Sequence, residues 1–152
     1  MPSSPPSVVS CSMPEPLPQA IICDLDGTLA HLNGRSPYDA SSCLDDGLNE
    51  PVAHIVRTYA GSEVAVILLT GREARFRRPT EQWLVHHGVP YDALHMRRTK
   101  DFRKDAVIKT ELFEAHIRGQ FEVLFVLDDR NQVVEMWRAM GLTCLQVAPG
   151  DF

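Results

Sequence analysis

Five short apolar runs, separated by segments with helical periodicity, constrain the fold of this 152-residue chain most strongly. The runs are rich in Val, Ile and Leu and cover residues 20–25, 63–69, 91–96, 121–127 and 142–147. Their near-continuous apolar character is typical of parallel strands that are covered on both faces. We therefore expect an α/β fold with a doubly wound, mainly parallel five-stranded sheet and helices on both faces.

The segments between these runs carry start and stop signals of helices. We predict four helices. The first begins after Asn49 and the second after Thr80, and the third and fourth cover about residues 102–118 and 131–140. Asn and Thr are favoured N-caps, and a glycine follows each predicted helix. Strand and helix thus alternate along the chain, as doubly wound sheets require.

The two ends of the chain differ in composition. Residues 1–18 include six prolines, so we expect a mobile Pro/Ser-rich tail followed by one domain over residues 19–152. No apolar run reaches the roughly 18 residues of a membrane-spanning helix, and no secretory signal is visible. The four cysteines have no metal-binding spacing. We therefore expect a reduced, cytoplasmic protein that does not contact a membrane.

Charge is distributed unevenly. The net charge is −5, which argues against simple coating of nucleic acid. Residues 72–104, however, contain nine of the fifteen Lys and Arg residues against four acids, so this segment is +5 and the remainder −10. The segment is either a solvated face or a surface that contacts phosphates.

Polar residues follow three of the predicted strands. They are Asp24, Asp26, Gly27 and Thr28 after the first, Thr70, Gly71 and Arg72 after the second, and Asp128 and Asp129 after the fourth. Because the carboxyl ends of parallel strands meet at one edge of a sheet, these groups are expected to converge there.

This set of side chains suits phosphoryl transfer to an aspartate. Asp24, Asp26 and Asp128 offer the oxygen ligands that Mg²⁺ prefers. Thr70, the Gly71 amide and a lysine are expected to donate to phosphoryl oxygens. In this hypothesis Asp24 attacks phosphorus, and Asp26 protonates the leaving oxygen and then activates water.

The motifs also resemble those of a known superfamily. DLDGT at 24–28, LLTGR at 68–72 and LDD at 127–129 resemble three motifs of the haloacid dehalogenase phosphatases. Lys104 fits the lysine of the remaining motif, but Lys109 lies one helical turn further on and competes for that role. The resemblance implies a Rossmann-like domain with a minimal cap or flap.

A closer resemblance runs from about residue 20 to the end. The stretches 24–39, 68–73, 97–109, 127–141 and 146–152 are similar to the 3′-phosphatase half of bacteriophage-type polynucleotide kinase/phosphatase. This implies a Mg²⁺-dependent enzyme that removes 3′-phosphates from DNA or RNA ends through an aspartyl-phosphate. The predicted catalytic residues are Asp24, Asp26, Thr70 and Lys104, the substrate contacts Thr28, Arg35, Gly71, Arg72, Arg97 and Asp105, and the metal ligands Asp24, Asp26, Asp128 and Asp129.

Alternatives remain open at this point. The same chemistry would serve a phosphatase of nucleotides or other small phosphomonoesters, and a signalling receiver domain also uses an aspartyl-phosphate. A large substrate is favoured because few residues separate Thr28 from Thr70, which leaves room only for a flap with a turn at Asn33-Gly34 and Arg35 after it. None of the nine glycines precedes a lysine, so this sequence contains no P-loop kinase motif. A kinase or ligase is then expected as a separate partner.

Overall fold

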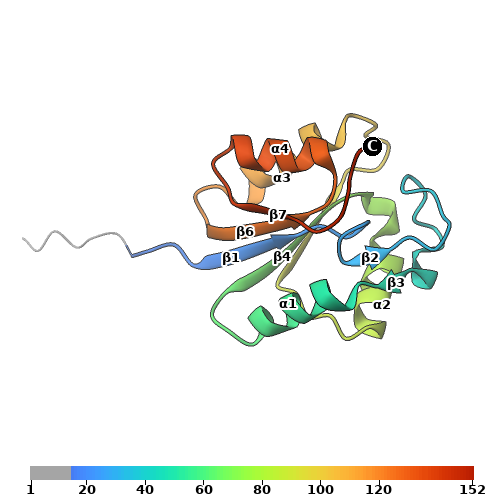
Figure 1. The fold of residues 1–152 in the computed structure, drawn as a ribbon, viewed down its shortest axis with the longest axis horizontal. Coiled ribbons are helices and arrows are strands. Elements are labelled where there is room, and N and C mark those ends of the chain that lie inside the picture. Colours follow the sequence, from blue (N-terminus) through green and yellow to red (C-terminus); the bar gives the residue numbers. More distant parts are fainter. Residues whose placement is uncertain (1–14) are drawn as a thin grey trace, which may run out of the picture.

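A five-stranded parallel sheet forms the centre of the molecule, in a computed structural model that describes residues 15–152. Figure 1 shows that helices cover both faces of this sheet. The strands are β1 (Gln19–Cys23), β4 (Ala65–Glu73), β5 (Ala93–Arg97), β6 (Glu122–Asp128) and β7 (Cys144–Gln146), in the order β5-β4-β1-β6-β7. Every neighbouring pair is parallel, so the predicted fold class is confirmed. Most of the predicted tail, residues 1–14, lies outside the described residues.

Two separate apolar layers hold the helices on the sheet. The helices are α1 (Glu50–Ala60) and α2 (Arg77–His86) on one face and α3 (Asp105–His116) and α4 (Asn131–Ala139) on the other. Because strand side chains alternate, Ile21 and Cys23 of β1 pack in the α1–α2 layer, whereas Ala20 and Ile22 pack in the α3–α4 layer. This double burial explains why the strands are continuously apolar in the sequence.

Helix α2 begins four residues earlier than predicted, at Arg77. Thr80 was expected to cap it from outside, but Thr80 lies inside the helix. Its hydroxyl donates to the Phe76 carbonyl at 2.7 Å and accepts from Arg72, so it does not accept a backbone N–H as an N-cap would. Pro79 falls in the first turn, where a missing N–H breaks no helical hydrogen bond. Thr80 therefore belongs to a polar network rather than to a helix end.

Helix α3 is shorter than predicted and begins at Asp105 rather than near Phe102. The preceding residues form a loop, hereafter the 98–104 loop. Lys100 in this loop has φ +64°, and Lys104, directly before the helix, has an extended backbone with φ −56° and ψ 143°, so the helix cannot begin before Asp105. The helix predicted over about residues 102–118 is therefore confirmed only from Asp105 to His116.

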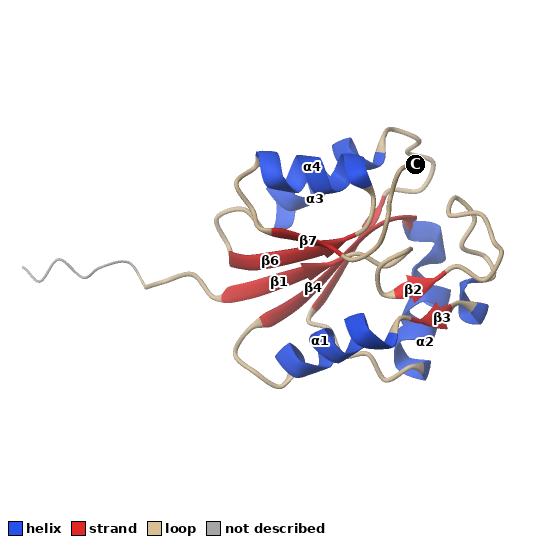
Figure 2. Cartoon of the chain, viewed as in Figure 1, coloured by secondary structure: helices blue, strands red, loops and turns tan. Residues whose placement is uncertain are grey.

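A small flap, residues 32–46, takes the place of a cap domain. It is bounded by β2 (Ala30–His31) and β3 (Gly47–Leu48), which pair as antiparallel strands, and it contains a short 3-10 helix, η1 (Cys43–Asp45). Figure 2 shows this pair beyond the carboxyl ends of the central strands, and a second 3-10 helix, η2 (Ala74–Phe76), follows β4. Among the described residues no helix has the length and apolar character needed to cross a membrane.

Candidate active site

Three buried aspartates form an acidic centre where β1 and β6 end. Asp24 follows the last residue of β1, Asp128 is the last residue of β6, and Asp129 comes next. One carboxylate oxygen from each lies within 4.8 Å of the others. The convergence follows from the topology, because β1 and β6 are parallel neighbours and Cys23 pairs with Leu127.

Lys109 supplies the cation that faces this centre. Its Nζ lies 3.0 Å from Asp24 Oδ1 and 2.9 Å from Asp128 Oδ2, and its side chain is buried. It also lies 3.6 Å from Asp105 Oδ2, one helical turn earlier on α3. Lys104, the predicted lysine, lies exposed before the helix. Of the two lysines left open by the sequence, the structure brings Lys109 to the acidic centre, because a side chain from the second turn of α3 reaches the ends of β1 and β6.

The electrostatics of the centre are unbalanced. Burial raises the pKa of Asp24 well above its usual value, the charge of Lys109 opposes this rise, and Asp128 and Asp129 add to it. Burial and the neighbouring Asp128 also raise the pKa of Asp129. Burial lowers the pKa of Lys109, but Asp105, Asp128 and Asp24 more than offset this, so the net pKa is raised. One ammonium thus faces more carboxylates than it can neutralise.

Short contacts fix the acidic centre in place. The Thr28 hydroxyl donates to Asp24 at 3.3 Å or to Asp129 at 3.2 Å, and the Trp137 indole N–H donates to Asp128 at 3.2 Å. Gly27 has φ +81°, and a Cβ there would lie 2.1 Å from an Asp129 oxygen. Thr28, predicted as a substrate contact, is fully buried and acts here on the two carboxylates. Gly27 is required both by its backbone conformation and by this close approach.

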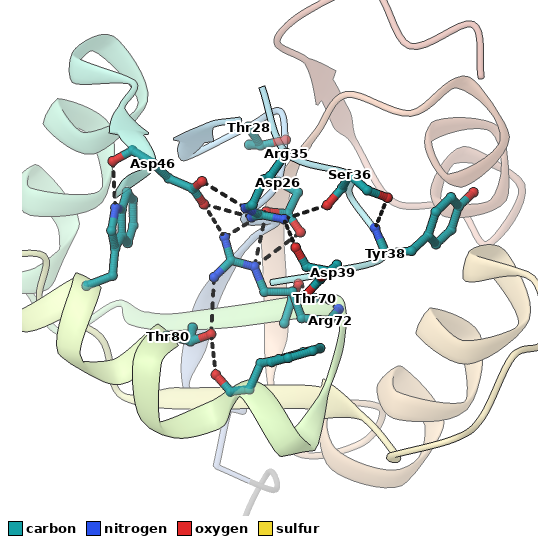
Figure 3. Close-up of polar contacts among 12 residues, drawn as sticks. Asp26, Thr28, Arg35, Ser36, Tyr38, Asp39, Asp46, Thr70, Arg72 and Thr80 are labelled. Atoms are coloured by element: carbon teal, nitrogen blue, oxygen red, sulfur yellow. Dashed lines mark hydrogen bonds and ion pairs between the residues drawn. The ribbon is translucent and has the colours of Figure 1, made fainter. Parts of the chain in front are cut away.

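The second aspartate of the motif has a different environment. Asp26 lies between Arg35 of the flap and Arg72 of β4, at 2.7 Å from an Nη2 atom of each (Figure 3). Both guanidinium groups also contact Asp46, at 2.7 Å and 3.1 Å. We call these four residues the arginine network. Burial lowers the pKa of Arg35, but its bonds to Asp46 and Asp26 more than offset this and the net pKa is raised.

The structure separates two sets of predicted residues. Asp26 was expected among the metal ligands together with Asp24, Asp128 and Asp129, and the structure clusters the carboxylates of the last three while the Asp26 carboxylate faces arginines. Arg35 and Arg72 were expected as contacts for a phosphate or substrate, and in the structure their side chains are buried against carboxylates of the chain itself. The physical reason is mutual neutralisation, because two arginines and two carboxylates satisfy one another.

Asp46 is the site residue that sequence reasoning missed. Its side chain is almost fully buried, and its backbone carbonyl accepts a hydrogen bond from the Trp83 indole at 2.9 Å. Thr80 extends the network by accepting from Arg72 Nη1 at 3.1 Å (Figure 3). Asp46 lies in an irregular segment with no motif around it. Only the three-dimensional fold brings it opposite two arginines.

The remaining predicted residues border the acidic centre. Arg97 donates to the Gly71 carbonyl at 2.8 Å and lies 3.3 Å from Asp105. Gly71 is needed because a Cβ there would lie 2.1 Å from an Asp105 oxygen. The Thr70 hydroxyl accepts from the Arg72 amide at 3.1 Å. All four are thus brought to the same edge of the sheet as Asp24.

A pocket of about 370 Å³ opens over these groups. Both aspartates of the motif line it, as does Asp129 of the acidic centre. Its outer walls come from the flap, which contributes Tyr38, and from the 98–104 loop, which contributes Phe102. The arrangement places the Asp24 carboxylate in an open pocket bordered by basic residues.

The donor set of the acidic centre fits a hard divalent cation. Three carboxylates supply oxygen atoms only, as Mg²⁺ prefers, and their excess negative charge requires a counter-ion. Asp24, Asp128 and Asp129 would hold such an ion.

Comparisons with known proteins agree with this geometry. The family model of the polynucleotide kinase PNKP phosphatase domain matches residues 18–152. A protein of Autographa californica nuclear polyhedrosis virus, which carries the provisional name bifunctional polynucleotide kinase/RNA ligase, is 35% identical over 128 residues, or 82% of this chain and 18% of the viral protein. Two solved structures of a Pnkp1/Rnl/Hen1 complex, one described as an RNA repair complex, superpose with a TM-score of 0.88 at 54% identity. They cover 90% of this chain but only 44% and 48% of theirs, so the chain spans at most about half of each relative.

Proposed function

This chain belongs to the family of polynucleotide kinase PNKP phosphatase domains, and we propose that it removes 3′-phosphates from polynucleotide ends. The observation that carries the proposal is the position of Asp24, buried beside Lys109 and two further carboxylates at the base of an open pocket. A carboxylate held in this way is an oriented nucleophile. Family membership argues against a receiver domain.

The reaction would proceed in two displacements. An Asp24 oxygen attacks phosphorus, the bond from phosphorus to the 3′ oxygen breaks, and Asp26 protonates the departing oxygen. Asp26 then takes a proton from the water that attacks the aspartyl-phosphate, which regenerates Asp24 and releases inorganic phosphate. A Mg²⁺ ion held by Asp24, Asp128 and Asp129 would supply positive charge that offsets the repulsion between a carboxylate and a phosphate.

Each residue around these two aspartates has a definite task in this scheme. Lys109 and Thr28 hold the Asp24 carboxylate in one orientation. Arg35 and Arg72 hold Asp26, whose side chain keeps 16% exposure and lines the pocket, so it remains accessible to a leaving group. The two aspartates therefore receive different orienting partners, as a nucleophile and a proton donor require.

The shape of the pocket supports a polynucleotide over a small metabolite. Between β1 and α1 the chain adds only the motif turn, the short β2–β3 pair and the flap of residues 32–46, and this flap borders an open pocket together with the 98–104 loop. A closed cap, which would sequester a small phosphomonoester, has no counterpart among residues 15–152. A kinase or ligase that acts on the same ends is proposed as a partner, since the viral relative is named as both and the solved relative belongs to an RNA repair complex.

A matched set of substrates tests the proposal. Phosphate release is measured from DNA and RNA oligonucleotides with either a 3′- or a 5′-phosphate, and from a 3′-mononucleotide, with Mg²⁺ or EDTA. We expect Mg²⁺-dependent release from 3′-phosphorylated oligonucleotides with the highest kcat/KM. A higher kcat/KM for the mononucleotide, or equal release from 5′ ends, would overturn the polynucleotide 3′-phosphatase assignment.

A further inference from the structure

The 98–104 loop is held more firmly than an ordinary surface loop. The backbone N–H of Lys100, at φ +64°, donates to a Glu73 carboxylate oxygen at 2.8 Å. The Arg97 guanidinium donates to the backbone carbonyls of Asp101 and Arg103. These contacts come from the ends of β4 and β5, so the sheet itself fixes the loop conformation. A left-handed non-glycine residue is retained only where surrounding contacts determine it.

This fixed loop presents a large apolar side chain to solvent. Phe102 is 84% exposed and lines the pocket above Asp24. Tyr38 of the flap is 73% exposed and lines the same pocket. Figure 1 shows the flap and the loop after β5 at the same end of the sheet, beyond the carboxyl ends of the strands. Large exposed side chains next to a reactive group indicate a binding surface.

The charge around Phe102 indicates what binds there. Residues 97–104 include five basic residues and one acid, Asp101. Arg103 is engaged by Asp101 and Glu111, whereas Lys104 is exposed and forms no salt bridge within residues 15–152. Aromatic faces beside cationic side chains are the usual combination for single-stranded nucleic acid, where bases stack and phosphates are attracted. A protein partner would not need this positive charge at an enzymatic pocket.

We propose that Phe102 is a stacking platform for an unpaired base next to the 3′-phosphate of the substrate, with Tyr38 as a second aromatic contact. This inference rests on the proposed function and names the form of its substrate, a single-stranded 3′ end. A base in a duplex is already stacked and paired, so exposing its face to Phe102 would cost unpairing. The platform therefore favours single-stranded over blunt 3′ ends.

Kinetics of Phe102→Ala on matched substrates test the proposal. The substrates are a single-stranded 3′-phosphorylated oligonucleotide, the same oligonucleotide with abasic 3′-terminal nucleotides, and p-nitrophenyl phosphate. We expect KM for the intact oligonucleotide to rise about 5- to 150-fold, which is the range for losing one base–aromatic contact. The kcat, the activity on p-nitrophenyl phosphate and the KM for the abasic substrate should change less than about twofold.

Two further variants control for packing and for surface hydrophobicity. Phe102→Tyr keeps an aromatic face and should retain the wild-type KM. Val85→Ala removes a side chain that is 77% exposed on α2 and outside the pocket, and it should change no parameter. An unchanged KM in Phe102→Ala, or equal losses on all three substrates, would overturn the stacking platform.

A separate measurement distinguishes failure of this inference from failure of the proposed function. Binding of a 3′-hydroxyl oligonucleotide, the expected product, is followed by fluorescence anisotropy and needs no turnover. If wild-type protein binds the intact strand more tightly than the abasic strand and Phe102→Ala removes the difference, the platform stands even if 3′-phosphatase activity is absent. If wild-type protein hydrolyses 3′ ends but binds both strands equally, the platform is wrong and the activity stands.

Discussion

The two aspartates of the DLDGT motif lie two residues apart but in opposite electrostatic surroundings. Asp24 shares a buried site with Asp128 and Asp129, and a single ammonium, Lys109, faces them. Asp26 lies in the arginine network, where two guanidinium groups face two carboxylates. The acidic centre therefore has more negative than positive charges, whereas the charges of the arginine network are equal in number. One region is suited to receive a cation and an anionic phosphate, and the other to hold a carboxylate in a fixed orientation.

The largest expected effect comes from Asp24→Asn, which removes the nucleophile from the acidic centre. We expect 3′-phosphate release to fall more than about 100-fold, because an amide of nearly equal volume does not attack phosphorus. Circular dichroism should show an unchanged fold. The control is Asp45→Asn, an exposed residue of η1, which should keep wild-type activity. More than about 1% residual activity in Asp24→Asn would remove it from the nucleophile role.

Lys109→Met sharpens the comparison by removing the only ammonium that contacts Asp24 among the described residues. The remaining carboxylates are then uncompensated, so we expect a loss of about 3–5 kcal/mol in the free energy of unfolding, measured without divalent cations. Activity should fall about 100-fold or more. Lys104→Met, at an exposed residue, should change stability by less than about 0.5 kcal/mol. Similar losses in both variants would contradict the geometric distinction between the two lysines.

Asp46→Asn tests whether the arginine network depends on charge balance. It keeps the shape of the side chain but removes the carboxylate that faces Arg35 and Arg72. We expect the free energy of unfolding to fall by about 2 kcal/mol, the size of a lost charged hydrogen bond. Mg²⁺ binding at the acidic centre should be unchanged, as measured by the Mg²⁺-induced rise in Tm. If Asp46→Asn abolishes that rise, the two regions are not independent.

The smallest expected effect is the pH dependence of Mg²⁺ stabilisation. At a Mg²⁺ concentration about 100 times Kd, binding adds about 2.7 kcal/mol, or about 5–10 °C in Tm. Because the pKa of Asp24 is raised above 3.8, the cation-free folded state binds more protons than the unfolded state between 3.8 and the raised pKa. Its stability therefore falls as pH rises through that window. Mg²⁺ must displace this proton, so the Tm rise should be larger at pH 7.5 than at pH 5.5, and a pH-independent rise would contradict the shifted pKa.

The extent of sequence-based prediction also differs between the two regions. The acidic centre was largely predictable, since Asp24, Asp128 and Asp129 follow two apolar runs and the carboxyl ends of parallel strands meet. The fold class was predictable for the same reason, because the runs and the helical patterns alternate. The start of α2 at Arg77 was not predictable, because Thr80 resembles an N-cap in the sequence but its hydroxyl bonds to the Phe76 carbonyl and to Arg72.

The arginine network was hidden from sequence reasoning. Arg35 and Arg72 were identified by motif position, but nothing local indicated that Asp46, eleven residues after Arg35 and twenty-six before Arg72, neutralises both. Lys109 was left as a competitor of Lys104, because helical periodicity could not fix where α3 begins. The extended backbone of Lys104 decides that point, since the helix then begins at Asp105, and Lys109 in its second turn contacts Asp24.

The central claim is that Asp24 forms a covalent bond to phosphorus while Asp26 acts on protons. Asp26→Asn is mixed with p-nitrophenyl phosphate and Mg²⁺, quenched within seconds and treated with borohydride, which reduces an aspartyl-phosphate to homoserine. A nitrophenolate leaving group needs no protonation, so the account predicts a rapid burst of about one nitrophenolate per protein and homoserine at position 24 by mass spectrometry. Turnover without a burst and with no modified residue, or modification at another residue, would contradict it.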